Sequence, residues 1–248
     1  MPVDRTKEIA RGRGVLEGAF GLLAAVEGSG GAGLTALATA SGLPKATAHR
    51  LLEQLLELGA LERSGAAYRV GPRLFQLGRR WQPHPGLREA AREPMRGLAA
   101  ATGASVGITV LAQGRALMAD AVPGELDELI ALRPGSSFPW TTAAGKVLVA
   151  GSAAAASLVP VPSGWAREAA AIRDRGVAVD MEEVVAGVCC VAVPVRAAGG
   201  RTVASVCALV EPARRPGPMT DAVLRTAKLI TARLRAAPTR LSRPAPSR

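Results

Sequence analysis

The residues best suited to chemistry in this chain are polar and basic side chains that follow a short turn near Gly42. Apolar residues recur at helical spacing in 34–41 and 45–58, on either side of that turn. Gly42 suits a left-handed turn position, and Pro44 suits the first turn of a helix. The second stretch carries the candidate contact residues Lys45, Thr47, His49 and Arg50. Two helices joined by a tight turn present such side chains to a DNA major groove, so the stretch predicts a helix-turn-helix.

Each of these side chains has a DNA-binding interpretation and a simpler one. Arg50 faces away from the apolar side of its helix and either donates two hydrogen bonds to a guanine edge or is a solvated charge. Lys45 and Thr47 lie near the helix N-terminus, where backbone N–H groups also favour phosphate; otherwise they cap the helix or lie on the surface. His49 either contacts DNA or packs beside the hairpin that follows.

Apolar spacing predicts the helices that hold these residues in place. Residues 14–27 form a first helix, a glycine-rich loop follows, and Thr35 caps the second helix. The third helix has an inward stripe made of Ala48, Leu51, Leu52, Leu55 and Leu58. Gly59 suits the position just after that helix ends.

A small hairpin completes the predicted DNA-binding domain, which spans residues 14–71. The strand-like runs 61–63 and 68–70 flank a turn and form this wing. Arg63 and Arg69 in the wing are candidates for contacts with flanking phosphates. The charged segment 1–13 is expected to be a flexible arm, and its Arg11 and Arg13 are candidates for reaching a groove or are simply a charged terminus.

The sequence pattern changes after a predicted linker at 72–84, whose helix spans 72–82 and is broken by Pro83 and Pro85. Strand-like runs occur at 106–111, 116–122, 129–132, 177–179, 188–195 and 202–210, and helical patterns at 86–101, 142–150, 166–175 and 220–236. Residues 85–236 should therefore form a mixed sheet with helices on its faces, which makes the fold class α+β. The Pro-, Ser- and Arg-rich segment 237–248 is expected to be a disordered basic tail.

Composition limits the possible functions. The formal net charge of +11 fits a polyanionic partner. Three cysteines offer no disulfide framework, and no leader or membrane-spanning run is found, so a cytoplasmic protein without membrane contact is expected. With only two histidines and no nucleophile elbow, P-loop, H-E-x-x-H or Rossmann fingerprint, an enzyme is the weaker alternative. No cofactor and no metal is expected.

The two halves together resemble the IclR-type family of bacterial transcriptional regulators over about residues 13–236. The stretches that carry the resemblance are Gly42–Leu52, Leu58–Arg63, Tyr68–Gly71, Thr142–Lys146, Arg175–Asp180 and Gly187–Pro194. The resemblance implies a winged helix-turn-helix joined by the linker helix to a GAF-like effector-binding domain. It further implies a homodimer or homotetramer on a partly palindromic operator in double-stranded DNA, with an affinity that a small molecule alters.

The same resemblance implies an effector pocket between the sheet and its loops. Carried over by position, its residues are Phe138, Ala144, Gly145, Asp180, Cys190, Cys207 and Leu209. The family often has hydroxyl residues where Cys207 and Leu209 stand, and a thiol is a weak donor while leucine offers none. The effector is then an acid or a less polar metabolite. The alternative is a DNA-binding oligomer whose pocket no longer binds ligand, with Asp180 a turn cap and Cys190 inert packing.

Overall fold

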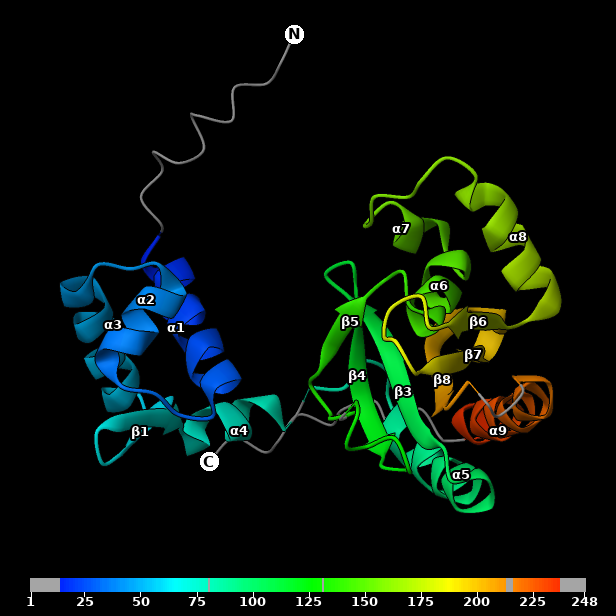
Figure 1. Cartoon of the computed structure of the whole chain (residues 1–248), viewed down its shortest axis with the longest axis horizontal. Helices are drawn as coiled ribbons and strands as arrows, with labels where there is room; N and C mark the ends of the chain where they lie inside the picture. The colour runs from blue at the N-terminus through cyan, green and yellow to red at the C-terminus, as the bar shows by residue number, and fades with distance from the viewer. Residues whose placement is uncertain (1–13, 80, 131, 213–215, 237–248) are drawn as a thin grey trace, which may run out of the picture. The chain divides into compact units, whose positions relative to one another are not determined.

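The computed structural model describes residues 14–79, 81–130, 132–212 and 216–236. The expected arm with Arg11 and Arg13 and the expected tail lie outside the described residues. The described part of the chain divides into two compact units, one ending at Trp81 and the other beginning at Gln82 (Figure 1).

The first unit is a helix-turn-helix followed by a hairpin. Its elements are α1 (Val15–Ser29), α2 (Leu34–Ser41), α3 (Lys45–Glu57), β1 (Leu61–Ser64), β2 (Ala67–Val70) and α4 (Pro72–Gly78). The antiparallel strands β1 and β2 pair with Leu61 opposite Val70. A single apolar cluster joins the three helices to the hairpin through side chains such as Leu22, Leu52 and Tyr68, so the hairpin is fixed against α3.

The turns of this unit follow the predicted chemistry, with three corrections. Gly42 and Gly59 both have positive φ, 63° and 68°, as expected for residues that end helices. Thr35 is not a cap, because the extended backbone of Gly33 starts α2 one residue before it. Leu58 was expected in the buried stripe of the third helix but is 69% exposed. It follows the last residue of α3, directly before the chain turns away at Gly59. The linker helix α4 ends at Gly78, four residues short of the expected end of its helical stretch at 82, since glycine disfavours further helix.

The second unit is a six-stranded sheet with helices on both faces. Its elements are α5 (Leu87–Thr102), β3 (Ser105–Ala112), β4 (Arg115–Val122), β5 (Ser137–Pro139), α6 (Ala143–Ala150), α7 (Ala153–Ala156), α8 (Trp165–Arg175), β6 (Ala178–Met181), β7 (Cys189–Arg196), the 3-10 turn η2 (Ala198–Gly200), β8 (Thr202–Val210) and α9 (Pro216–Ala236). The strand order is β5-β4-β3-β8-β7-β6. The α+β fold class is confirmed, but every described pairing is antiparallel, so the sheet is not mixed.

The two faces of this sheet bury different apolar clusters, and each face is covered by its own helices (Figure 1). Helices α5 and α9 cover one face and bury residues such as Val106, Val206 and Ala208. Helices α6 and α8 lie on the other face, whose cluster includes Cys207 and Leu209. Because side chains alternate along a strand, β8 sends Cys207 and Leu209 to the α6 side and their neighbours to the α5 side.

The prediction of a strand at 129–132 is wrong, because residues 129, 130 and 132 are not in a strand. The backbone N–H groups of Leu129 and Ile130 both donate to the carbonyl of Leu126 and form turns. The strand at this edge of the sheet is instead β5, which pairs with β4. Apolar side chains in this segment cover part of the sheet face without joining it, which explains why the sequence resembles a strand. None of the described helices is both long and apolar enough to cross a bilayer.

Candidate DNA-binding surface and effector pocket

Helix α3 presents its candidate contact residues because its opposite side is buried. Ala48 and Leu52 are fully buried in the core of the first unit. Lys45, His49 and Arg50 are exposed and Thr47 is half-buried on its edge. Within the described residues, neither Lys45 nor Arg50 takes part in an ion pair. Both charges are therefore available to an external anion.

Glu53 on the same helix organises two of the other candidates. The His49 Nε2 lies 3.8 Å from the Glu53 Oε1. Arg63 in the wing pairs with that same carboxylate, donates to the Tyr68 hydroxyl at 3.2 Å, and lies 5.2 Å from the Tyr68 ring centroid. Arg63 thus fastens the hairpin to α3, so its charge is already partly neutralised.

Arg69 occupies the opposite strand of the hairpin and stays exposed. In the register of the hairpin, Arg69 lies opposite Glu62. A Cβ placed on Gly31 would lie 3.3 Å from the Arg69 Cγ, so the arginine stem covers the loop between α1 and α2. The head group of Arg69 remains at the surface beside that loop.

A pocket opens on the α6 side of the sheet in the second unit. It encloses about 500 Å³ of space between atoms, including its opening to solvent. Six of the seven residues expected there line it: Phe138, Ala144, Asp180, Cys190, Cys207 and Leu209. Gly145 does not line it but shapes its wall, because a Cβ on Gly145 would lie 2.3 Å from the Trp140 carbonyl oxygen.

The remaining lining residues were not assigned to the pocket from the sequence, although Thr142 begins one of the stretches that carry the family resemblance. They are Thr109, Ala116, Met118, Ile130, Leu132, Thr142, Val184, Val185 and Val188. Strand alternation could have found Thr109, since Ile108 and Val110 face the other cluster. No local pattern indicates Ile130 or Leu132, which reach the pocket from an irregular loop.

Asp180 is the one carboxylate among the described lining residues, and it is only 4% exposed. Its Oδ1 accepts the backbone N–H of Glu183 at 2.8 Å. Burial raises the pKa of Asp180, and the charge of Glu183 acts in the same direction, against the opposing effects of backbone N–H donors and Lys146. Asp180 is therefore both a turn cap and a pocket residue.

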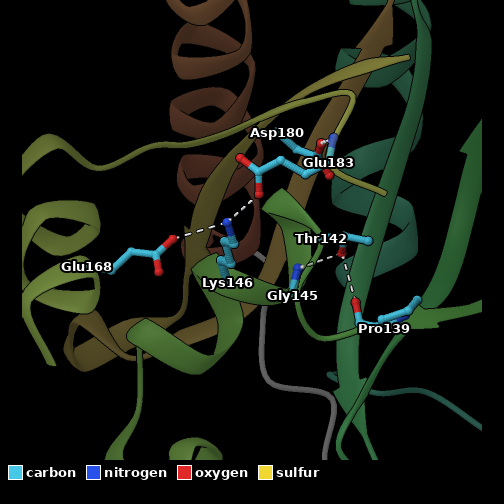
Figure 2. Close-up of polar contacts among 7 residues, drawn as sticks. All are labelled: Pro139, Thr142, Gly145, Lys146, Glu168, Asp180 and Glu183. Carbon is cyan, nitrogen blue, oxygen red and sulfur yellow. Dashed lines mark hydrogen bonds and ion pairs between the residues drawn. The ribbon is translucent and has the colours of Figure 1, made fainter. Parts of the chain in front are cut away.

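Lys146 lies beside the pocket and is held by two acids (Figure 2). Its Nζ is 2.8 Å from the Glu183 Oε2 and 3.1 Å from the Glu168 Oε1. Burial lowers the pKa of Lys146, but hydrogen bonds to Glu183 and Glu168 and their charges outweigh it, so the pKa is raised. This cation ties α6 to α8 and to the loop after β6.

The first turn of α6 is capped by its own chain. Thr142 donates its hydroxyl to the Pro139 carbonyl at 3.0 Å and accepts the Gly145 N–H at 3.2 Å, as Figure 2 shows. The single proton of this hydroxyl is thus already donated within the chain.

Two thiols face the pocket from neighbouring strands. Cys190 on β7 and Cys207 on β8 both line it, and neither forms a disulfide. The hydrogen bond between them, together with burial, raises the pKa of Cys190, so this thiol stays protonated at neutral pH. Within the described residues, no group of three or more metal-ligating side chains occurs.

Both halves of the chain match families with established descriptions. Residues 15–65 match the IclR helix-turn-helix domain, and residues 162–233 match the bacterial transcriptional regulator IclR C-terminal domain. The chain is 32% identical over 179 residues to the glycerol operon regulatory protein of Streptomyces coelicolor, covering 66% of this chain and 70% of that protein. It is 30% identical over 190 residues to the HTH-type transcriptional regulator XynR of Escherichia coli, covering 69% and 75%.

Solved structures agree on the fold. An IclR homolog from Microbacterium hydrocarbonoxydans, solved in complex with 4-hydroxybenzoate, has a TM-score of 0.79 at 20% identity and covers 90% of this chain and 100% of that one. The relatives are named as regulators, so the interpretation as a regulator rather than an enzyme is confirmed. The chain belongs to the IclR family of DNA-binding bacterial transcriptional regulators.

Proposed function

We propose that this regulator acts in the cytoplasm as a homodimer or homotetramer on a partly palindromic operator, and that a small molecule in the pocket changes its operator affinity. The observation that carries the proposal is a lined pocket in the same chain as an exposed recognition helix. Ligand binding alters DNA affinity only if the ligand binds the DNA-competent state and the other state with different affinities, and we propose that these states differ in the spacing of the two DNA-reading units.

At the DNA, we assign the base-reading role to Arg50 and phosphate contacts to Lys45 and Thr47. The support is that Lys45 and Arg50 are exposed on α3, and that Lys45 and the half-buried Thr47 lie in its first turn, where the helix N-terminus also favours phosphate. Arg69 suits a flanking phosphate because its head group is exposed. His49 and Arg63 are secondary contacts, since both already face Glu53.

The test of the proposal couples ligand binding to DNA binding. An operator is first selected from random duplexes with the full chain, and its affinity is then measured by fluorescence anisotropy with and without candidate metabolites. A true effector should shift the dissociation constant by roughly 5- to 150-fold, as typical coupling energies imply. If every compound that stabilises the protein leaves operator affinity unchanged, the pocket does not control DNA binding. The alternative of a DNA-binding oligomer with a fixed affinity then stands.

Exposed apolar side chains on α1 support self-association. Leu16 and Phe20, one helical turn apart, are 75% and 71% exposed. Such side chains on a helix commonly mark a protein contact. We expect Phe20→Asp to weaken self-association by about 2 kcal/mol, or roughly thirtyfold, because it would bury a charge in that contact. Sedimentation equilibrium measures the change.

The matched control is Leu158→Asp, which adds the same charge at a leucine that is 64% exposed in the other unit. It should leave the association constant unchanged. Equal effects of the two variants would contradict an interface on α1.

A further inference from the structure

We propose that the effector of this regulator is an uncharged, largely apolar molecule with one hydroxyl group, of the simple phenol class, rather than a carboxylate. The inference rests on the proposed function, because it names the ligand class of the same pocket. It is carried by the polar side chains on the pocket wall and by the hydrogen bonds that they already form.

The hydroxyl protons at the wall are already used within the chain. Thr109 donates its hydroxyl to the Ser205 carbonyl at 3.3 Å, and Thr142 donates to the Pro139 carbonyl. The thiols of Cys190 and Cys207 are weak donors, and Leu209 has none. The described wall therefore offers no strong hydrogen-bond donor from a side chain to a carboxylate.

The charges at the pocket disfavour an anion as well. No lysine, arginine or histidine occurs among the described residues that line it. The nearby cation Lys146 is held between Glu168 and Glu183. A carboxylate entering the pocket would lose its water, gain no cation and approach Asp180, so its binding is opposed on each count.

Asp180 instead suits a ligand that donates. A carboxyl group offers about four acceptor positions, and the backbone N–H groups of Glu183 and Val184 take only part of them. Asp180 lines the pocket and is 4% exposed, so a ligand there meets a carboxyl group that still has acceptor positions to fill. The sulfur atoms of Met118, Cys190 and Cys207 provide soft surfaces for an aromatic ring. A ring with one hydroxyl satisfies both parts of the wall.

Four small aromatic probes that differ in charge and in the ring hydroxyl test this ligand class on the full-length protein. They are p-cresol, 4-hydroxybenzoate, toluene and benzylamine, compared by calorimetric titration and by thermal shift. We expect p-cresol to bind at least tenfold more tightly than the other three, and to change operator affinity. The proposal is overturned if 4-hydroxybenzoate or benzylamine binds as tightly as p-cresol, or if p-cresol does not bind.

A pocket variant separates failure of this inference from failure of the proposed function. Cys207→Ser combined with Leu209→Ser adds two hydroxyl donors and should gain binding of 4-hydroxybenzoate by tenfold or more. If the unmodified protein binds 4-hydroxybenzoate and not p-cresol, the ligand class is wrong and the proposed function stands. If neither protein binds any of the four probes, the pocket does not take small aromatic ligands, and both proposals lose their support.

The role of Asp180 is tested by Asp180→Asn, whose amide oxygen can still accept the Glu183 N–H. We expect p-cresol to lose about tenfold in affinity while toluene is unaffected, because only p-cresol donates to this group. Asp174→Asn, on the exposed side of α8, is the matched control and should change neither. Equal losses for the two probes would assign Asp180 a merely structural role and overturn its part in the proposal.

Discussion

Replacing Arg50 with alanine is expected to weaken operator binding by about 1–3 kcal/mol, which is roughly 5- to 150-fold. The physical reason is that Arg50 is exposed on α3, takes part in no ion pair within the described residues and can donate twice to a guanine edge. Fluorescence anisotropy on the selected operator measures the loss. The same titration on a scrambled duplex shows whether the loss is specific, because removing a base contact lowers the ratio of operator affinity to scrambled-duplex affinity.

Two further variants make this result interpretable. Arg96→Ala removes the same charge from α5 in the other unit and should leave operator binding within experimental error. Lys45→Ala should weaken binding to both duplexes alike, since a phosphate contact is independent of sequence. It should also reduce the slope of the salt dependence of binding by about one released counterion. Unchanged binding by the Arg50 variant on both duplexes would remove its assigned role.

The recognition helix was largely predictable from sequence because its signals are local. The apolar stripe through Leu51 and Leu52, and Gly59 beyond it, define α3 closely. The features that local signals missed also have physical reasons. Thr35 has the chemistry of a cap, but Gly33 adopts the extended backbone that starts α2, and no pattern distinguishes two candidates so close together. The pairing of Arg63 with Glu53 joins elements that propensity alone does not bring together.

The pocket was predictable only in part, because its wall is assembled from distant segments. Resemblance to the family supplied Asp180, Cys190 and Cys207, whose positions follow conspicuous strand motifs. Leu132 and its neighbour Ile130 were misread as a strand, since an apolar run has the same composition whether it pairs in a sheet or covers one. Which hydroxyl protons are already donated depends on the folded chain, so the inferred preference for a neutral ligand required the structure.

Replacing Gly145 with alanine is expected to destabilise the second unit by about 3 kcal/mol and to deform its pocket. A Cβ there would lie 2.3 Å from the Trp140 carbonyl oxygen and 2.5 Å from its Cα, and backbone atoms cannot move aside as a flexible side chain can. Trp140 is also anchored, since its ring packs edge-on against Trp165 with centroids 5.1 Å apart. The strain must therefore displace the first turn of α6, which carries Ala144 in the pocket wall. Chemical denaturation followed by tryptophan fluorescence measures the loss.

The matched control is Gly97→Ala in α5, where an added Cβ meets nothing within 4 Å. It should stabilise the protein by about 0.4–1 kcal/mol, because alanine restricts the unfolded chain more than glycine does. Since the described chain has two compact units and one unfolding curve does not tell which of them is destabilised, operator binding without ligand is measured alongside. A Gly145 variant that keeps operator affinity but loses both stability and p-cresol binding would place the damage at the α6 wall. A Gly145 variant as stable as the Gly97 variant would contradict the close approach of α6 to Trp140.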